Sequence, residues 1–236
     1  MVNASSPTAH DIRQIFDSIA PIYDDLNQQL SLGLHRVWKR MTVRWSGAQP
    51  GHRCLDVCCG SGDLALLLAE QVGPPGKIYG VDFSAEQLAI AQHRAAHTWA
   101  CPPIHWYQAD AIALPFEDQS FDAITMGYGL RNLTNYLKGL QELRRVLRPG
   151  SRAAILDFHH PANPLLRQFQ QWYLTTIVVP YAERLGQKHA YAYIVPSLEH
   201  FPNGPAQEAL AEAAGFSQAT HYPIAGGLMG VLVAIR

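Results

Sequence analysis

The residues best suited to chemistry in this chain surround a glycine-rich turn. Residues 55–63 read Leu-Asp-Val-Cys-Cys-Gly-Ser-Gly-Asp, and a second acidic side chain, Asp82, follows Gly62 by twenty positions. An apolar strand that ends in glycines and restarts as a helix lets backbone N–H groups approach a ligand closely, and an acidic residue at this distance reaches a ribose. The spacing therefore predicts a site for an adenosine-containing ligand.

The charges around the turn favour a cationic ligand over a dinucleotide. The glycines with Ala65 also satisfy the dinucleotide pattern, and a tight turn without a ligand is the plainest alternative. However, Asp56 precedes the glycines at the strand end, where its carboxylate would repel a phosphate, and no Lys or Arg stands between Arg53 and Lys77. We therefore expect a positively charged ligand that carries an amino acid.

Alternating strand and helix signals over about residues 53–158 predict a parallel sheet with helices on both faces. In such a sheet the ligand lies beyond the carboxyl ends of the strands, and Asp56, Asp82 and Asp110 each follow or end a predicted strand. Three carboxylates at one edge indicate a site. The strands are expected at 53–58, 77–82, 104–108, 121–126, 152–158 and 228–235.

Three helices can be bounded from local signals. A capping box of Ser84 and Gln87 predicts a helix that runs to about Thr98. A leucine stripe predicts a second helix, which ends at Pro149. The third helix is expected at 206–214. The stripe consists of Leu137, Leu140, Leu143 and Leu147.

The composition of the 236-residue chain is typical of one globular unit, with 48% hydrophobic residues and a formal net charge of −1. That balance predicts no nucleic-acid partner. The sequence shows neither a signal-peptide pattern nor an apolar run of the roughly 18 residues that span a bilayer, so a cytoplasmic location is expected. The four cysteines lack metal-ligand spacing, so no metal is expected, and adjacent Cys58 and Cys59 indicate a reducing compartment.

These features together resemble the class I S-adenosylmethionine methyltransferases, and within them the ubiquinone/menaquinone-biosynthesis C-methyltransferase family. The turn at 55–63 and the segment 109–116 recur across many methyltransferases, whereas segments 27–39, 129–132 and 197–202 are much more specific to this family. The sequence of the turn, residues 55–63, is most similar to that of the phylloquinone branch of the family. Further matching segments are 16–24, 121–122 and 145–150.

The resemblance implies a Rossmann-like α/β fold: a mostly parallel seven-stranded sheet with a C-terminal antiparallel strand and helices on both faces. It implies a single domain over 1–236. Within it we expect an N-terminal helical cap (1–50), a cofactor-binding core (51–158), a substrate-side helical insertion (159–205) and a C-terminal helix with strands (206–236).

The cofactor implied by the resemblance is S-adenosyl-L-methionine. Its methionine part is expected over the turn with Ser61 in contact, and the carboxylate of Asp82 is expected to accept from both ribose hydroxyls. Asp110 and Ala111 would flank the adenine, and Gly127 would lie near the sulfonium. The residues expected around the cofactor are Asp56, Gly60, Ser61, Gly62, Asp82, Phe83, Asp110, Ala111 and Gly127.

The reaction implied is methylation of a ring carbon of a reduced, prenylated (phytyl) naphthoquinone in phylloquinone biosynthesis. It requires orientation of two substrates, a base for a phenolic proton and exclusion of water. Arg131 with Asn132 is expected to hold or polarise the ring oxygen, directly or through a water; the alternative is that Arg131 pairs with a buried carboxylate and shapes its loop. The general base is left open among Asp157, His159, His160, Tyr23 and Tyr128.

Two segments are expected to meet an apolar substrate. Segment 34–45 combines an apolar stripe with a basic face, which is typical of a helix on an anionic membrane surface; a helix packed over the cofactor with a solvated basic face is the plainer alternative. Segment 169–193 is rich in aromatic and aliphatic residues, which suit an isoprenoid channel or the core of a helical insertion. The stripe is Leu34, Val37, Trp38, Met41 and Trp45, and the basic residues are Arg36, Lys39, Arg40 and Arg44.

Rival functions predict different patterns. A menaquinone or ubiquinone ring methyltransferase is the alternative within the same family; the chain departs from some of its relatives at Asp110, where they carry Asn, and at residues 157–161, where they often show Glu-Phe-Ser-x-Pro. A nicotinamide-dependent dehydrogenase explains the glycines and Asp82 but neither Asp56 nor Asp110. A non-catalytic partner protein with a methyltransferase fold predicts cofactor binding without transfer. The pattern specifies no oligomeric state.

Overall fold

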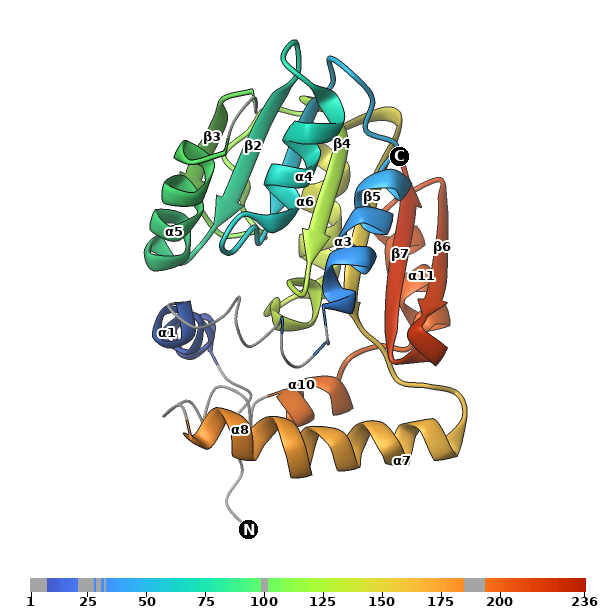
Figure 1. Ribbon diagram of the computed structural model, residues 1–236. Helices are drawn as coiled ribbons and strands as arrows, with labels where there is room; N and C mark the ends of the chain where they lie inside the picture. Colours follow the sequence, from blue (N-terminus) through green and yellow to red (C-terminus); the bar gives the residue numbers. More distant parts are fainter. Residues whose placement is uncertain (1–7, 21–27, 29–30, 32, 99–101, 185–193) are drawn as a thin grey trace.

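A seven-stranded sheet in the order β3-β2-β1-β4-β5-β7-β6 forms the centre of the computed structural model (Figure 1). The model describes residues 8–20, 28, 31, 33–98, 102–184 and 194–236. All neighbours from β3 to β5 pair in parallel, and β7 is antiparallel to both β5 and β6. The strands are β1 (Arg53–Val57), β2 (Lys77–Asp82), β3 (Ile104–Gln108), β4 (Phe121–Gly127), β5 (Leu147–Phe158), β6 (Gln218–Ile224) and β7 (Met229–Ile235).

This topology confirms the predicted Rossmann-like sheet with a C-terminal antiparallel strand. The chain order reverses between β1 and β4, so the carboxyl ends of these two strands flank the switch point at which ligands bind in open α/β sheets. The side chains between the layers form a continuous apolar core, in which Leu55, Phe121 and Ile124 are fully buried. The core fixes the strand ends that carry the predicted site.

Helices cover both faces of the sheet. One face carries α3 (Leu34–Trp45), α4 (Asp63–Val72) and α5 (Ala85–Ala96), and the other carries α6 (Tyr136–Val146) and α11 (Gly204–Ala213) (Figure 1). Several begin with a side-chain cap: Ser84 Oγ accepts from Gln87 N, and Asn135 Oδ1 accepts from Lys138 N. Short 3-10 turns, η2 (Leu130–Asn132) and η4 (Ala225–Gly227), follow β4 and β6.

A second group of helices lies beyond the carboxyl ends of the parallel strands. Figure 1 shows α7 (Pro164–Tyr173), a π-helical turn η3 (Leu174–Val178) and α8 (Val179–Arg184) as one continuous helix below the strand arrowheads, with α1 (Ala9–Ile19) and α10 (Ile194–Glu199) above it. Ile19, Leu174, Val178 and Leu198 form a buried cluster that joins these helices. They therefore form a layer over the edge of the sheet that carries the predicted site.

Two predicted element boundaries are wrong. The leucine stripe was expected to remain helical through Leu147, but α6 ends at Val146 and β5 begins at Leu147, because this residue pairs with Phe121 of β4. Pro149 and Gly150 thus lie inside β5, where Gly150 N donates to the carbonyl of Arg236. Strand β6 has no counterpart among the expected ranges, because its sequence is polar and contains Pro223, which an edge strand tolerates.

The buried face of α3 also differs from the prediction. Leu34 and Val37 of the apolar stripe are 50% and 51% exposed, whereas Lys39, expected on the solvated basic face, is only 5% exposed. The reason is the carboxylate of Asp63, which lies 2.5 Å from Lys39 Nζ and offsets the cost of burying this charge. The hydrophobic pattern therefore predicts only part of the buried face: Trp38 and Trp45 pack against the core, whereas the start of the stripe is exposed and Lys39 is buried.

Candidate active site

The glycine-rich turn between β1 and α4 has a left-handed backbone at three of five positions. The φ angles of Cys58, Gly60 and Gly62 are 54°, 53° and 89°. Glycine adopts such angles without steric cost, which explains the glycines at 60 and 62, whereas Cys58 is a strained position. The turn carries its backbone across the carboxyl end of β1, at the switch point of the sheet.

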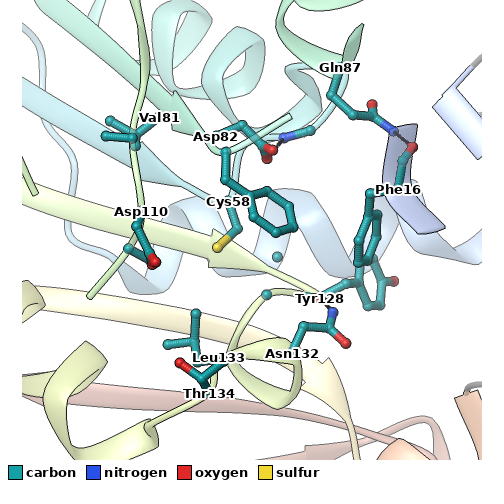
Figure 2. Close-up of a pocket in the computed structure, with 16 residues that line it drawn as sticks. Phe16, Cys58, Val81, Asp82, Gln87, Asp110, Tyr128, Asn132, Leu133 and Thr134 are labelled. Carbon is teal, nitrogen blue, oxygen red and sulfur yellow. Dashed lines mark hydrogen bonds between the residues drawn. The ribbon is translucent and has the colours of Figure 1, made fainter. Parts of the chain in front are cut away.

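Asp82 anchors the front of this turn. Its carboxylate accepts from Gly60 N at 2.8 Å and from Ser84 N at 2.9 Å, and the residue is only 6% exposed. Burial raises the pKa of Asp82 to about 6, although hydrogen bonds from these backbone N–H groups act to lower it. Figure 2 shows the carboxylate at the wall of a cavity, where its remaining lone pairs can accept from a ligand.

Asp56 lies behind the turn and is fully buried. Its Oδ1 accepts from Thr125 Oγ1 at 2.8 Å, while its Oδ2 has no hydrogen-bond partner among the described residues. Burial raises the pKa of Asp56 to about 7, and the positive charge of Lys39 acts in the opposite direction. A buried acceptor of this kind is costly unless a ligand donor or a cation satisfies it.

A cavity of about 720 Å³, including space open to solvent, lies in front of the turn (Figure 2). Most of the predicted cofactor residues line it: Gly60, Asp82, Phe83, Asp110, Ala111 and Gly127. Asp56, Ser61 and Gly62 are not part of this lining. Asp56 is fully buried behind the turn, and Ser61 is buried and accepts from Arg94 on the side of α5. A Cβ on Gly127 would come within 2.8 Å of Leu64 Cδ1, so the end of β4 approaches the turn closely.

This cavity fits an adenosine-bearing cation. Its walls combine aromatic and aliphatic groups with unsatisfied acceptors, since Gln87 Oε1 and Asn132 Oδ1 also lack partners among the described residues. S-adenosylmethionine carries an ammonium group, ribose hydroxyls and an apolar purine. Asp56 would hold the ammonium, Asp82 the ribose, and Asp110 with Ala111 the adenine, so the donor set agrees with the group implied by the sequence.

The loop after β4 is organised around the carbonyl of Tyr128. Tyr128 has a φ of 59°, and its carbonyl accepts from Arg131 Nη1 at 3.0 Å and from Asn132 Nδ2 at 2.8 Å. Arg131 also pairs with Asp157 at 2.6 Å, and both residues are buried. Asn132 lines the cavity and Arg131 does not (Figure 2). The geometry places Arg131 behind Asn132, as in the alternative in which it shapes the loop.

The candidate bases differ sharply in their surroundings. Asp157 is engaged by Arg131, and His160 Nε2 lies 2.6 Å from the carbonyl of Leu198. Burial lowers the pKa of His159 to about 4, and its ring lies 4.5 Å from that of His221, not at the cavity. Of the candidates within the described residues, Tyr128 is the one that lines the cavity. Tyr23 lies outside the described residues.

Several lining residues were not singled out from the sequence as ligand contacts. Phe16 of α1 covers the cavity, with its ring centroid 6.2 Å from that of Phe83. Gln87 was assigned to a capping box, but its Nε2 instead donates to the carbonyl of Phe16 at 3.5 Å, and so links α5 to α1. The family-like segment around Phe16 was the available signal. Other lining residues are Cys58, Val81, Ala109, Gly129, Leu133 and Thr134.

Among the described residues, no group of three or more His, Cys, Asp or Glu side chains is arranged to hold a metal ion. No helix in the described part of the chain is both long and apolar enough to cross a membrane.

Comparisons with known proteins agree with this geometry. The model of the ubiE/COQ5 methyltransferase family matches residues 4–236. The 2-phytyl-1,4-naphtoquinone methyltransferase of Trichormus variabilis is 60% identical over 95% of this chain and 98% of its own length. The chloroplastic 2-phytyl-1,4-beta-naphthoquinone methyltransferase of Arabidopsis thaliana is 50% identical over 97% of this chain and 88% of its own length.

Solved structures show the same fold at low sequence identity. A SAM-dependent methyltransferase from Aquifex aeolicus superimposes with a TM-score of 0.66 at 21% identity, over 93% of this chain and 97% of its own. A further methyltransferase structure, from Methanococcus maripaludis, gives a TM-score of 0.64 at 18% identity, over 100% of this chain and 97% of its own. These structures share the architecture of the chain.

Proposed function

Because the chain belongs to the ubiE/COQ5 methyltransferase family, which matches residues 4–236, we propose that it methylates the ring of a phytyl-bearing naphthoquinol, the final ring methylation of phylloquinone biosynthesis. It is an S-adenosylmethionine-dependent methyltransferase. The observation that carries the substrate proposal is 50–60% identity over nearly the full length to proteins named for 2-phytyl naphthoquinone methylation. The spelling of the turn and the loop at 129–132 support it.

S-adenosylmethionine, when bound, supplies a methyl group made electrophilic by a sulfonium. We propose that Asp56 and Asp82 hold its ammonium and ribose from opposite ends of the turn. Both carboxylates are ionised when they act, so binding weakens as each becomes protonated.

Asn132 is proposed to orient the quinol. Its Oδ1 is a buried acceptor at the cavity wall, and it suits a ring hydroxyl, which donates. Its Nδ2 is fixed on the Tyr128 carbonyl, so the amide has one defined orientation. Arg131, held by Asp157, fixes the same carbonyl and therefore acts through Asn132. The general base stays open among Asp157, His159, His160, Tyr23 and Tyr128.

The layer formed by α1, α7, η3, α8 and α10 is proposed to exclude water. Phe16 belongs both to the cavity wall and to the apolar cluster of this layer, so the cover continues directly from the cofactor site. Positive and negative charge approach each other and partly cancel in methyl transfer to a phenolate, and exclusion of water strengthens their interaction.

Methyl transfer to a defined quinol tests the function. The purified protein is incubated with methyl-labelled S-adenosylmethionine and chemically reduced 2-phytyl-1,4-naphthoquinone, and the lipid is analysed by mass spectrometry. We expect a product heavier by one CH2 unit with the label on the ring. Binding of S-adenosylhomocysteine without transfer to any prenyl naphthoquinol would instead indicate a non-catalytic protein. Transfer to a benzoquinol alone would indicate a ubiquinone-type substrate.

Peripheral contact with a membrane is the second part of the proposal. Leu34 and Val37 are half exposed at the start of α3, beside the exposed bases Arg36 and Arg40. On the outer layer, Leu165, Phe169 and Trp172 are 73%, 47% and 52% exposed. No Asp or Glu occurs between Asp157 and Glu183. Exposed Trp and apolar side chains without nearby carboxylates suit an anionic bilayer surface, from which a phytyl substrate would be drawn.

A further inference from the structure

Lys39 connects α3 to the back of the glycine-rich turn. Its side chain is 7% exposed, and its Nζ lies 2.5 Å from Asp63 Oδ2 at the start of α4. The other oxygen, Asp63 Oδ1, lies 2.6 Å from Arg94 Nη2 of α5. Arg94 Nη1 then donates to the carbonyl and the hydroxyl oxygen of Ser61, at 2.8 and 3.0 Å. Two ion pairs that join three helices therefore meet at the turn, and none of these residues lines the cavity.

Asp63 is strongly held in its charged form by this arrangement. Although burial opposes ionisation, Lys39 and Arg94 together lower the pKa of Asp63 to about 2. Asp63 is therefore a carboxylate at neutral pH.

Asp56 is a nearby carboxylate that, within the described part of the chain, is buried without a full set of partners. Its Oδ2 is buried without a partner among the described residues, and Lys39 favours its ionised form. The groups that face it are Thr125 on β4, the Ala65 backbone on α4, Lys39 on α3 and Asp82 on β2. Of these, Lys39 supplies the positive charge, whereas Asp82 opposes ionisation. The thiols of Cys58 and Cys59 stay neutral because burial raises their pKa.

We infer that Lys39 is a positioning residue for the methyl donor: it keeps Asp56 ionised to receive the donor's ammonium group and, through Asp63 and Arg94, fixes the back of the turn. The inference rests on the proposed placement of that ammonium against Asp56. It explains why α3, which supplies no residue to the cavity lining, buries a lysine beside the two tryptophans of its stripe that pack against the core, Trp38 and Trp45.

The sign of the pH effect follows from the carboxylate. Because the pKa of Asp56 is raised to about 7, the ionised fraction grows as pH rises through neutrality, and donor binding grows with it. Removal of the Lys39 charge raises this pKa further, so the rise in affinity moves to higher pH. The affinity lost with the Lys39 charge should therefore be largest at and below neutral pH and small at high pH, where Asp56 is ionised in both proteins.

Binding of S-adenosylhomocysteine, measured by calorimetry from pH 6 to 9, tests the inference. We expect Lys39→Met to bind about tenfold more weakly than wild type at pH 7 and to approach wild-type affinity near pH 9, while Lys39→Arg keeps the wild-type profile. Arg40→Met is the matched control, because it removes the next positive charge along α3 from an exposed position. It should leave the profile unchanged.

A second cycle separates charge from packing. Asp56→Asn should remove the rise in affinity above pH 6.5, and Lys39→Met added to Asp56→Asn should produce no further pH shift. If Lys39→Met has a wild-type pH midpoint, whatever its affinity, the lysine is merely structural and the inference is overturned. If Lys39→Met does not fold by circular dichroism, Lys39→Gln is measured by the same criteria. Failure of the wild type to bind S-adenosylhomocysteine at any pH would instead contradict the proposed cofactor site.

Discussion

At Asp82, folding stability and ligand binding depend on pH in opposite directions. Its pKa is raised to about 6 because it is buried, so the folded apo protein binds this proton more tightly than the unfolded chain does. The stability associated with that proton is present at low pH and is lost as pH rises through 6. Ligand binding needs the ionised form and therefore has the opposite pH dependence.

Asp82→Asn is expected to weaken S-adenosylhomocysteine binding by at least about tenfold at pH 7.5, because an amide offers a ribose one acceptor oxygen in place of two. Because Asp56 titrates near 7, both proteins should lose affinity as pH falls through neutrality, but only the wild type should show the further loss below about 6 that comes from Asp82. Calorimetric titration at pH 5 and 7.5 measures both effects. Unchanged affinity in a folded variant would remove Asp82 from the site.

Arg131 belongs to a buried ion pair, so its removal is expected to affect folding before catalysis. Arg131→Ala leaves Asp157 buried without its cation and should cost about 3–5 kcal/mol of stability. Arg131→Ala combined with Asp157→Asn should recover part of that loss, because no unpaired charge remains. Urea unfolding of the single and double variants measures the coupling. Additive destabilisation would show that the pair is energetically unimportant.

Asn132→Ala is expected to separate catalysis from folding at the same loop. The variant keeps the Arg131–Asp157 pair but loses the amide at the cavity wall, so turnover should fall about 10-fold to 100-fold while affinity for S-adenosylhomocysteine stays within about twofold. Steady-state methyl transfer and calorimetry measure the two quantities. A wild-type turnover would contradict the proposed role in holding the quinol.

At the scale of elements, the sequence predicted those whose signals are local. The glycine turn, the strand at Lys77–Asp82 and the N-cap at Ser84 depend on neighbouring residues and appear as expected. The start of β5 and the whole of β6 depend on pairing with distant strands, so no local signal marked them. The buried face of α3 depends on Asp63, twenty-four positions from Lys39, and a periodicity argument cannot include such a partner.

The contact between the turn after β1 and the loop after β4 is an element-level feature that can be tested. A Cβ on Gly129 would lie 2.6 Å from Cys58 Cβ, an atom fixed to the backbone of the turn. Gly129→Ala should therefore displace the turn and weaken S-adenosylhomocysteine binding by about tenfold or more. Gly150→Ala is the control: its φ of 78° makes the alanine strained, but its Cβ would meet no atom within 4 Å beyond the chain neighbours, so it can cost stability and should leave binding unchanged. Equal affinities of the two variants would show that the turn tolerates displacement.

At the scale of the whole molecule, the fold separates two tasks. The sheet and the helices on its faces hold the turn and its carboxylates, whereas the layer beyond the carboxyl edge closes the site and presents apolar groups outward (Figure 1). The sheet and the turn could be predicted from the sequence because their motifs recur at fixed spacing. The exposure of the second layer could not, because the aromatic residues of 169–193 fit a core and a surface equally well.

The outward face of that layer predicts how the protein meets its lipid substrate. Phe169→Ser combined with Trp172→Ser should reduce binding to anionic phospholipid vesicles about tenfold, because both side chains are about half exposed and suited to the membrane interface. Turnover of a phytyl quinol presented in vesicles should fall in parallel, while turnover of a short-chain, water-soluble quinol stays unchanged. Vesicle co-sedimentation and the two methylation assays measure these outcomes.

Tyr107→Ser supplies the matched control for this prediction, because Tyr107 is a partly exposed aromatic residue on strand β3 and not on the outer layer. It should bind vesicles as the wild type does. If the double variant instead changes the oligomeric state in light scattering and leaves vesicle binding intact, the exposed face is an interface between two copies of the chain. In that case the substrate must reach the cavity by another route, and the exposed start of α3 at Leu34 and Val37 becomes the surface to alter next.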